Sequence, residues 1–103
     1  MSVYLHVTLE VRAAGLGRFL EAMEKTAVPF LEREGWRLAG AFVQRTGRLH
    51  TIIDLWELDD FQHYDRALKA LAADPGFPAF SALLAETVIS ETIVFADRAS
   101  YMH

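Results

Sequence analysis

The sequence predicts one α+β domain in which helices cover one face of a four-stranded antiparallel sheet. Four segments have the alternating or β-branched and aromatic composition of strands, and two longer segments carry apolar residues at helical spacing. Their order along the chain is strand, helix, strand, strand, helix, strand. This order is that of the split βαβ, or ferredoxin-like, arrangement.

The first strand covers residues 3–12, "VYLHVTLEVR", and alternates strictly. Every odd-numbered position from Val3 to Val11 is apolar, whereas the even-numbered positions include Tyr4 and His6. A period of two residues with one fully apolar face is typical of a strand that covers a core.

The first helix is expected over about residues 15–34, where apolar residues form one stripe. Pro29 lies inside this segment and should kink the helix, because it removes a backbone hydrogen bond. Gly35 follows and suits the left-handed position that ends many helices.

A hairpin follows, with strands at residues 36–46 and 49–58. Gly40 marks a bulge or a close approach in the first of these strands, and Gly47 turns the chain into the second. The second strand is "LHTIIDLWEL" and carries an aspartate, Asp54, in its middle.

The acidic pair at residues 59–60 predicts the start of a second amphipathic helix that begins near Phe61. Pro75 could open a short third helix with Phe77 turned inward. The last strand is expected over residues 87–96. The remaining residues, 97–103, have no pattern and are expected to be a loose tail or to reach a partner subunit.

The right-handed crossover rule places the first and third strands side by side in the centre of the sheet. The apolar face of the first strand should meet the helices. The other face is too apolar to be left in water, so a second copy is expected to cover it in a two-fold dimer. That face carries Tyr4, His6 and Thr8 and, if the third strand alternates in step, His50, Ile52, Asp54, Trp56 and Leu58.

Composition narrows the function classes. The chain has 103 residues, no cysteine and a net charge of −4, so disulfides and thiolate chemistry are excluded and one domain is expected over residues 1–103. Basic residues are scattered, which argues against a nucleic-acid surface. No apolar run reaches the length of a membrane span and the first residues do not resemble a signal peptide, so a cytoplasmic protein is expected.

The segments "GRLHTIIDLWELDDF" and "ALAADPGF" resemble the NIPSNAP family of the dimeric α/β-barrel superfamily. Gly47, Leu55, Trp56, Asp74 and Pro75 fit the family pattern without a gap, and "FLEREGWRLAGAFV" is also similar. The resemblance covers nearly the whole chain. It implies a homodimeric α/β barrel and says little about the reaction.

The chain departs from that pattern at four polar positions. His50 stands where the family usually has Asn, and Asp54 where it usually has His. Leu58 replaces a Tyr, and Tyr64 replaces an Arg. These changes indicate either a pocket with altered specificity or neutral substitutions in a pocket that is no longer used.

Asp54 is the strongest candidate for a catalytic group. A buried and unpaired carboxylate would cost several kcal/mol, so it either pairs across an interface or serves as a general base with a raised pKa. His50 lies about 13 Å away along the strand, too far for a hydrogen bond. His6, on the adjacent strand, is expected to be the best-placed partner.

Tyr64 could donate its phenol hydrogen to a substrate oxygen or could simply pack in the core. Tyr4, Trp56, Phe42 and Phe77 could line a cavity suited to aromatic ligands, or could be ordinary packing residues. The histidine spacing predicts no metal site. A haem bound by one histidine, as in related members of the superfamily, stays a less favoured alternative.

The sequence therefore favours a homodimeric enzyme that needs no cofactor and transfers protons on a small apolar or aromatic metabolite. The reaction would be an isomerisation, an aldol-type cyclisation or the oxygenation of an activated phenol, and a loose similarity to plant polyketide cyclases fits this group. Asp54 would be the base or the orienting acid, and His6 or His50 would shuttle the proton. The alternative is a non-catalytic homodimer that binds a small molecule or another protein.

Overall fold

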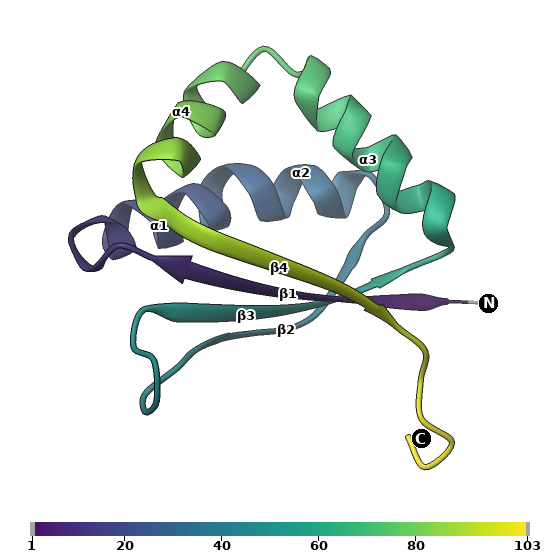
Figure 1. Cartoon of the computed structure of the whole chain (residues 1–103). Helices are drawn as coiled ribbons and strands as arrows, with labels where there is room; N and C mark the ends of the chain where they lie inside the picture. Colours follow the sequence, from purple (N-terminus) through teal and green to yellow (C-terminus); the bar gives the residue numbers. More distant parts are fainter. Residues whose placement is uncertain (1, 103) are drawn as a thin grey trace.

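The computed structural model describes residues 2–102; Met1 and His103, and with His103 the last residue of the expected tail, lie outside the described residues. Four antiparallel strands form one sheet in the order β2-β3-β1-β4, and the helices lie together on one side of it (Figure 1). This is the ferredoxin-like α+β fold, with β1 and β3 in the centre as expected. The strands are β1 (Val3–Val11), β2 (Arg37–Val43), β3 (Thr51–Leu58) and β4 (Val88–Ala96).

The helices are α1 (Leu16–Ala22), α2 (Val28–Arg33), α3 (Phe61–Ala73) and α4 (Phe77–Thr87), and a short 3₁₀ turn covers Ala13–Gly15. None of the helices in residues 2–102 combines the length and the apolar character needed to span a bilayer. The bulge expected at Gly40 is confirmed, because the register of β2 against β3 shifts between Leu38 and Gly40.

A π-helical turn, η2 (Met23–Ala27), joins α1 to α2 and accounts for the proline in the first helical segment. The amide of Val28 donates to the carbonyl of Met23, five residues earlier. Pro29 follows directly, and its ring and missing N–H prevent a regular bond to the carbonyl four residues before it. The irregularity expected at Pro29 is therefore a widened turn within the helix, and Met23 and Ala27 belong to it.

The register of the two central strands corrects one prediction. Val7 of β1 pairs with Asp54, and Leu5 pairs with Trp56. Paired residues in an antiparallel ladder point to the same side of the sheet, so Asp54 and Trp56 lie on the helix-covered face. The prediction that Asp54 shares a face with His6 is wrong, because a one-residue change in alternation moves every side chain to the other face.

His63 joins the end of α2 to the start of α3 and is buried. Its Nε2 lies 2.6 Å from the carbonyl oxygen of Glu34, and its Nδ1 accepts a hydrogen bond of 3.0 Å from the amide of Asp59. Its own amide donates to the Asp60 carboxylate at 2.8 Å, which caps α3. Helical periodicity alone places His63 on the polar face of α3, but these backbone groups hold the ring inside.

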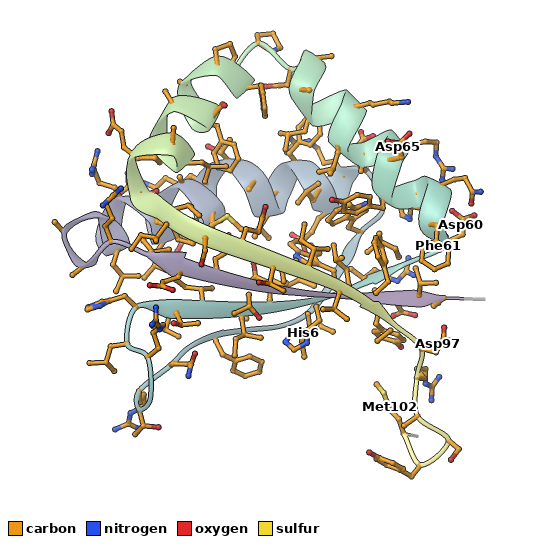
Figure 2. The ribbon with its side chains drawn as sticks, viewed as in Figure 1. His6, Asp60, Phe61, Asp65, Asp97 and Met102 are labelled. Atoms are coloured by element: carbon orange, nitrogen blue, oxygen red, sulfur yellow. The ribbon has the colours of Figure 1, made fainter. Side chains whose placement is uncertain are left out.

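The face of the sheet away from the helices, called the open face, carries exposed apolar residues. Phe42 is 56% exposed and Val94 is 49% exposed. His6 lies on this face, paired with Leu55 and Val94, and Figure 2 shows it on the side opposite the helices. The residues after β4 leave the sheet toward the same side (Figure 1).

We predict that His63→Ala lowers the free energy of unfolding by about 2 to 4 kcal/mol, because the backbone groups of Glu34 and Asp59 lose their buried partner. Urea denaturation followed by circular dichroism measures this change. Arg66→Ala, an exposed change on the same helix, is the matched control and should leave stability within about 0.5 kcal/mol. Equal stability of the two variants would contradict the bridging role.

Candidate functional site

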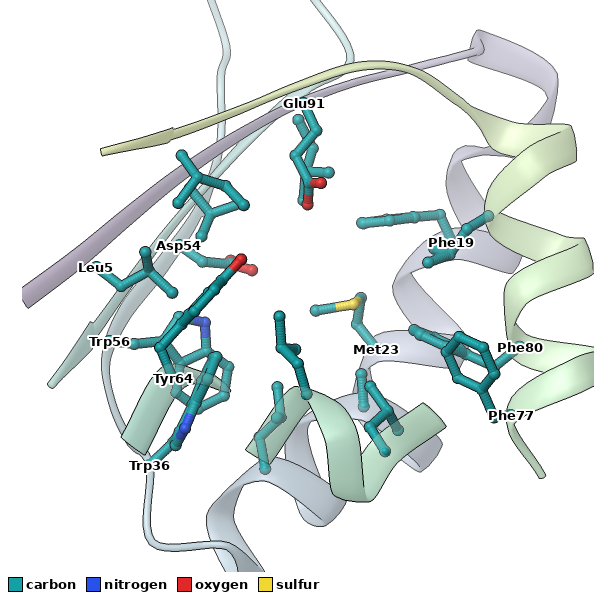
Figure 3. A pocket seen from close by; sticks show the side chains of 18 residues that line it. Leu5, Phe19, Met23, Trp36, Asp54, Trp56, Tyr64, Phe77, Phe80 and Glu91 are labelled. Atoms are coloured by element: carbon teal, nitrogen blue, oxygen red, sulfur yellow. The ribbon is translucent and has the colours of Figure 1, made fainter. Parts of the chain in front are cut away.

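A cavity of about 330 Å³ lies between the sheet and the helices, and we call it the inner cavity. Its walls come from β1, β3 and β4 on one side and from the helices on the other (Figure 3). The lining is mostly aliphatic and aromatic, with three ionisable side chains. These are Asp54 from β3, Tyr64 from α3 and Glu91 from β4.

Asp54 sits in the middle of the sheet, with Val7 and Ala41 as its neighbours on the adjacent strands. Its side chain is buried, with 4% of the residue exposed. Among residues 2–102 its carboxyl group has neither a hydrogen-bond nor an ion-pair partner, and burial alone raises its pKa from the usual 3.8 to about 6. A carboxyl group with such a pKa can both lose and accept a proton near neutral pH.

Tyr64 is held by aromatic contacts that aim its hydroxyl into the inner cavity (Figure 3). Its ring stacks on Trp36 with centroids 5.8 Å apart and meets the ring of Phe95 edge-on at 5.1 Å. Burial, with Glu91 and Asp65 adding to it, raises the pKa of Tyr64 above its usual 10.0. The phenol therefore stays protonated at neutral pH and can donate a hydrogen bond.

Glu91 is an exposed residue of β4 whose carboxylate points into the inner cavity (Figure 3). It pairs with Leu9, which places it on the helix-covered face together with Ile93 and Phe95. Glu91 is not among the site residues predicted from the sequence. A sequence pattern could have identified it, because Glu91 is the one charged residue in an otherwise apolar set at alternate positions of the last strand.

Other predicted site residues lie on different sides of the sheet. Trp56 and Phe77 border the inner cavity with Asp54 and Tyr64. Tyr4 and His6 lie on the open face. The structure therefore brings Asp54 together with Tyr64, and does not bring it together with His6.

His50 lies in the turn before β3 and not in the strand. Its φ of 62° is left-handed, which is uncommon for a residue other than glycine. Its carbonyl accepts a hydrogen bond of 2.9 Å from the amide of Val11. The placement of His50 in the strand was wrong because the connection between β2 and β3 is longer than a tight hairpin turn.

A second hollow of about 460 Å³ lies between the β2 edge of the sheet and the first helical segment, and we call it the edge hollow. Phe42 borders it. Phe19, Met23 and Asp54 border both the edge hollow and the inner cavity. The carboxyl group thus stands where the two spaces meet.

The positions of the histidines bear on the metal and haem alternatives. Of the histidines that the structure describes, none borders the inner cavity or the edge hollow. Within residues 2–102 no group of three His, Cys, Asp or Glu side chains is placed to hold a metal ion. Residues 2–102 therefore offer no histidine nitrogen in these hollows as an axial ligand for haem.

Comparison with known proteins agrees with this architecture. The family model described as NIPSNAP matches residues 4–95. The chain belongs to the NIPSNAP family. No curated protein is similar enough to this NIPSNAP chain to serve as a relative of known activity.

Solved structures give the same fold. A NIPSNAP domain protein from Burkholderia xenovorans is 25% identical, with a TM-score of 0.81 over 100% of this chain and 99% of its own. A Caulobacter crescentus protein proposed to be an antibiotic biosynthesis monooxygenase is 16% identical, with a TM-score of 0.74 over 96% of this chain and 91% of its own. A dimeric ferredoxin-like protein from an uncultured marine organism is 13% identical, with a TM-score of 0.68 over 99% of this chain and 91% of its own.

We predict that Asp54→Asn stabilises the protein at pH 7.5 by about 2 kcal/mol, allowing for partial solvent access, because a neutral amide avoids the buried charge. The folded carboxyl group holds its proton more tightly than the unfolded one. Wild-type stability should therefore fall as the pH rises from 3.8 to about 6 and stay level above. Urea denaturation at several pH values checks both statements.

In the Asp54→Asn variant, the decrease in the free energy of unfolding between pH 4 and pH 6 should be about 2 kcal/mol smaller than in the wild type. Below pH 4 the two proteins should be equally stable. Asp65→Asn, an exposed carboxylate on α3, is the matched control. A variant that is less stable than the wild type at pH 7.5 would show that Asp54 has a stabilising partner.

Proposed function

We propose that this protein is a cytoplasmic enzyme that needs no cofactor and transfers protons on a small apolar or aromatic metabolite held in the inner cavity. One observation carries the proposal. Asp54 is a buried carboxyl group with no charged or hydrogen-bonding partner among residues 2–102, and it borders an otherwise apolar space. Such a group weakens the fold when ionised, and its pKa of about 6 suits a general base.

In the proposed mechanism, Asp54 removes a proton from a carbon next to a carbonyl group, or from a phenol. The electron pair of the broken bond moves onto the substrate oxygen, and Tyr64 stabilises the developing charge by donating a hydrogen bond. If Asp54 returns the proton to another carbon, the result is isomerisation. If the deprotonated carbon instead attacks a second carbonyl group and Asp54 returns the proton to the new alkoxide, the result is aldol-type cyclisation. Glu91 at the exposed side of the cavity exchanges protons with the solvent.

The charges of the cavity define its ligand further. Among residues 2–102, no lysine, arginine or histidine borders it. A carboxylate or phosphate on the ligand would therefore meet Asp54 and Glu91 without a compensating cation. A neutral ligand with a carbonyl or phenol group suits the cavity, and Trp36 and Trp56 offer it flat apolar surface.

The structure changes the roles proposed for the histidines. His6 and His50 lie outside the inner cavity, so Glu91 takes the role of proton shuttle in this proposal, and Tyr64 donates a hydrogen bond to the substrate oxygen. Oxygenation of an activated phenol stays within the proposal, with dioxygen as the oxidant, so that phenol and dioxygen give a quinone and water; the fold shared with the Caulobacter crescentus protein supports it. That reaction begins with the same loss of the phenol proton.

We also propose that two copies pack through their open faces. Exposed Phe42 and Val94 support this, since a face with such residues is rarely left in water. The tail beyond β4 leaves on this side (Figure 2). Tyr101 in the tail is 82% exposed. A structural neighbour described as dimeric has the same fold. The tail would then reach the partner subunit.

We expect the wild-type protein to accelerate exchange of deuterium into the activated CH₂ group of 2-tetralone, a neutral aromatic ketone, in D₂O. Asp54→Asn should lower the rate of the catalysed exchange by at least about 100-fold, because the amide cannot accept the proton. The wild-type rate should rise between pH 5 and pH 7, since the base form of Asp54 appears near its pKa of about 6. Proton NMR follows the exchange.

His6→Ala is the matched control for this experiment and should keep the wild-type exchange rate. If Asp54→Asn exchanges the probe as fast as the wild type, Asp54 is not the base. If the wild type binds the ketone without exceeding the buffer rate, the chain is a non-catalytic binding protein instead.

We predict that Val94→Asp converts the proposed dimer into a monomer, because it places a charge on the covered face. Analytical ultracentrifugation distinguishes the mass of two chains from that of one. Leu49→Asp, which alters an equally exposed apolar residue outside the open face, should leave the wild-type mass unchanged. A wild-type protein that sediments as a monomer would contradict the assembly.

A further inference from the structure

We propose that the ligand is elongated, with its polar head at Asp54 in the inner cavity and an unbranched apolar tail in the edge hollow. This inference rests on the proposed function, because it names the class of molecule that the same site takes. It adds a second binding subsite, which the solvent-exposed β2 edge of the sheet provides.

The first observation is that the two spaces share walls. Phe19, Met23 and Asp54 border both of them, so the two spaces lie on either side of these three side chains. Ala41, which borders the edge hollow, is the direct partner of Asp54 on β2. Neighbouring strands lie about 4.8 Å apart, so the edge hollow begins one strand away from the carboxyl group.

The second observation is the chemistry of the edge hollow. Its lining is aliphatic and aromatic apart from Asp54 at the inner end and Glu24 at the outer end. The outer wall includes Leu20, which is 39% exposed, and Val43, which is 42% exposed. A charged or strongly polar ligand tail would find no hydrogen-bond or ion-pair partner along this wall. A hydrocarbon tail would instead cover the apolar wall and remove its surface from water.

The third observation concerns Met23, which stands between the two spaces. It belongs to the π-helical turn, and its side chain lies in the close view of the inner cavity (Figure 3). Methionine has three rotatable side-chain bonds and adapts to irregular gaps. Its rotation can widen the passage beside Asp54 without moving the sheet or the helices.

The test uses para-ethylphenol, para-butylphenol and para-hexylphenol as probes, titrated by isothermal calorimetry below their aggregation concentrations. The phenol hydroxyl places the head at Asp54, and the alkyl chain reports on the edge hollow. For the wild type we expect affinity to rise along the whole series, by up to about fourfold for each added methylene group.

Ala41→Phe and Leu20→Trp should each fill the edge hollow from an exposed position, one from the strand and one from the helix. In both variants the ratio of the affinities for para-hexylphenol and para-ethylphenol should fall by at least tenfold. Ala82→Phe, an exposed change on α4 away from the edge hollow, is the matched control and should keep the wild-type ratio. Two blocking variants keep the test decisive if one of them fails to fold.

The outcomes separate this inference from the proposed function. If the short probe binds the wild type but longer chains add no affinity, the edge hollow is not a subsite, while the inner cavity still binds its ligand. The same conclusion follows if the blocking variants keep the wild-type ratio. If no member of the series binds, both the subsite and the proposed phenol-binding function are overturned.

Discussion

In the centre of the sheet, Val7 of β1 lies opposite Asp54 of β3, and this pairing places the carboxyl group on the side that the helices cover. The position of every other group in the site follows from it. Tyr64 and the tryptophans can surround the carboxyl group only because the helices pack on that face. The raised pKa has the same origin, since the layer that encloses the site also removes water from around the acid.

The two faces of the sheet therefore differ in chemical character. The helix-covered face holds an apolar cavity with an acid, a phenol and a second carboxylate in its wall. The open face carries exposed apolar residues that suit association with another copy. The proposed binding and the proposed assembly meet at Phe42, which lies on the open face and also borders the edge hollow. Asp54, Tyr64 and Glu91 lie away from the open face, so a change at these residues can leave the assembly intact.

The strand order, the central pair β1 and β3, the bulge at Gly40 and the NIPSNAP relationship were all predictable from the sequence. The side of the sheet that Asp54 faces was not, because "TIIDLWEL" is apolar at both odd and even positions and gives no clear alternation. The burial of His63 was hidden for a related reason, since its partners are backbone groups that leave no mark in the sequence. Glu91 could have been found, because Ile93 and Phe95 fix the alternation of its strand.

The π-helical turn has a consequence for how such a site could diverge between relatives. A π turn holds one more residue than the α-helical turn that it replaces, so loss of a single codon there would convert the segment to an α-helix that is kinked at Pro29. Residues on one side of the deletion would then rotate by about 100° about the helix axis relative to those on the other. Phe19 before the π turn and Leu31 after it could then no longer both face the inner cavity as they do now. One small genetic event could thus reshape the binding space while leaving the sheet untouched.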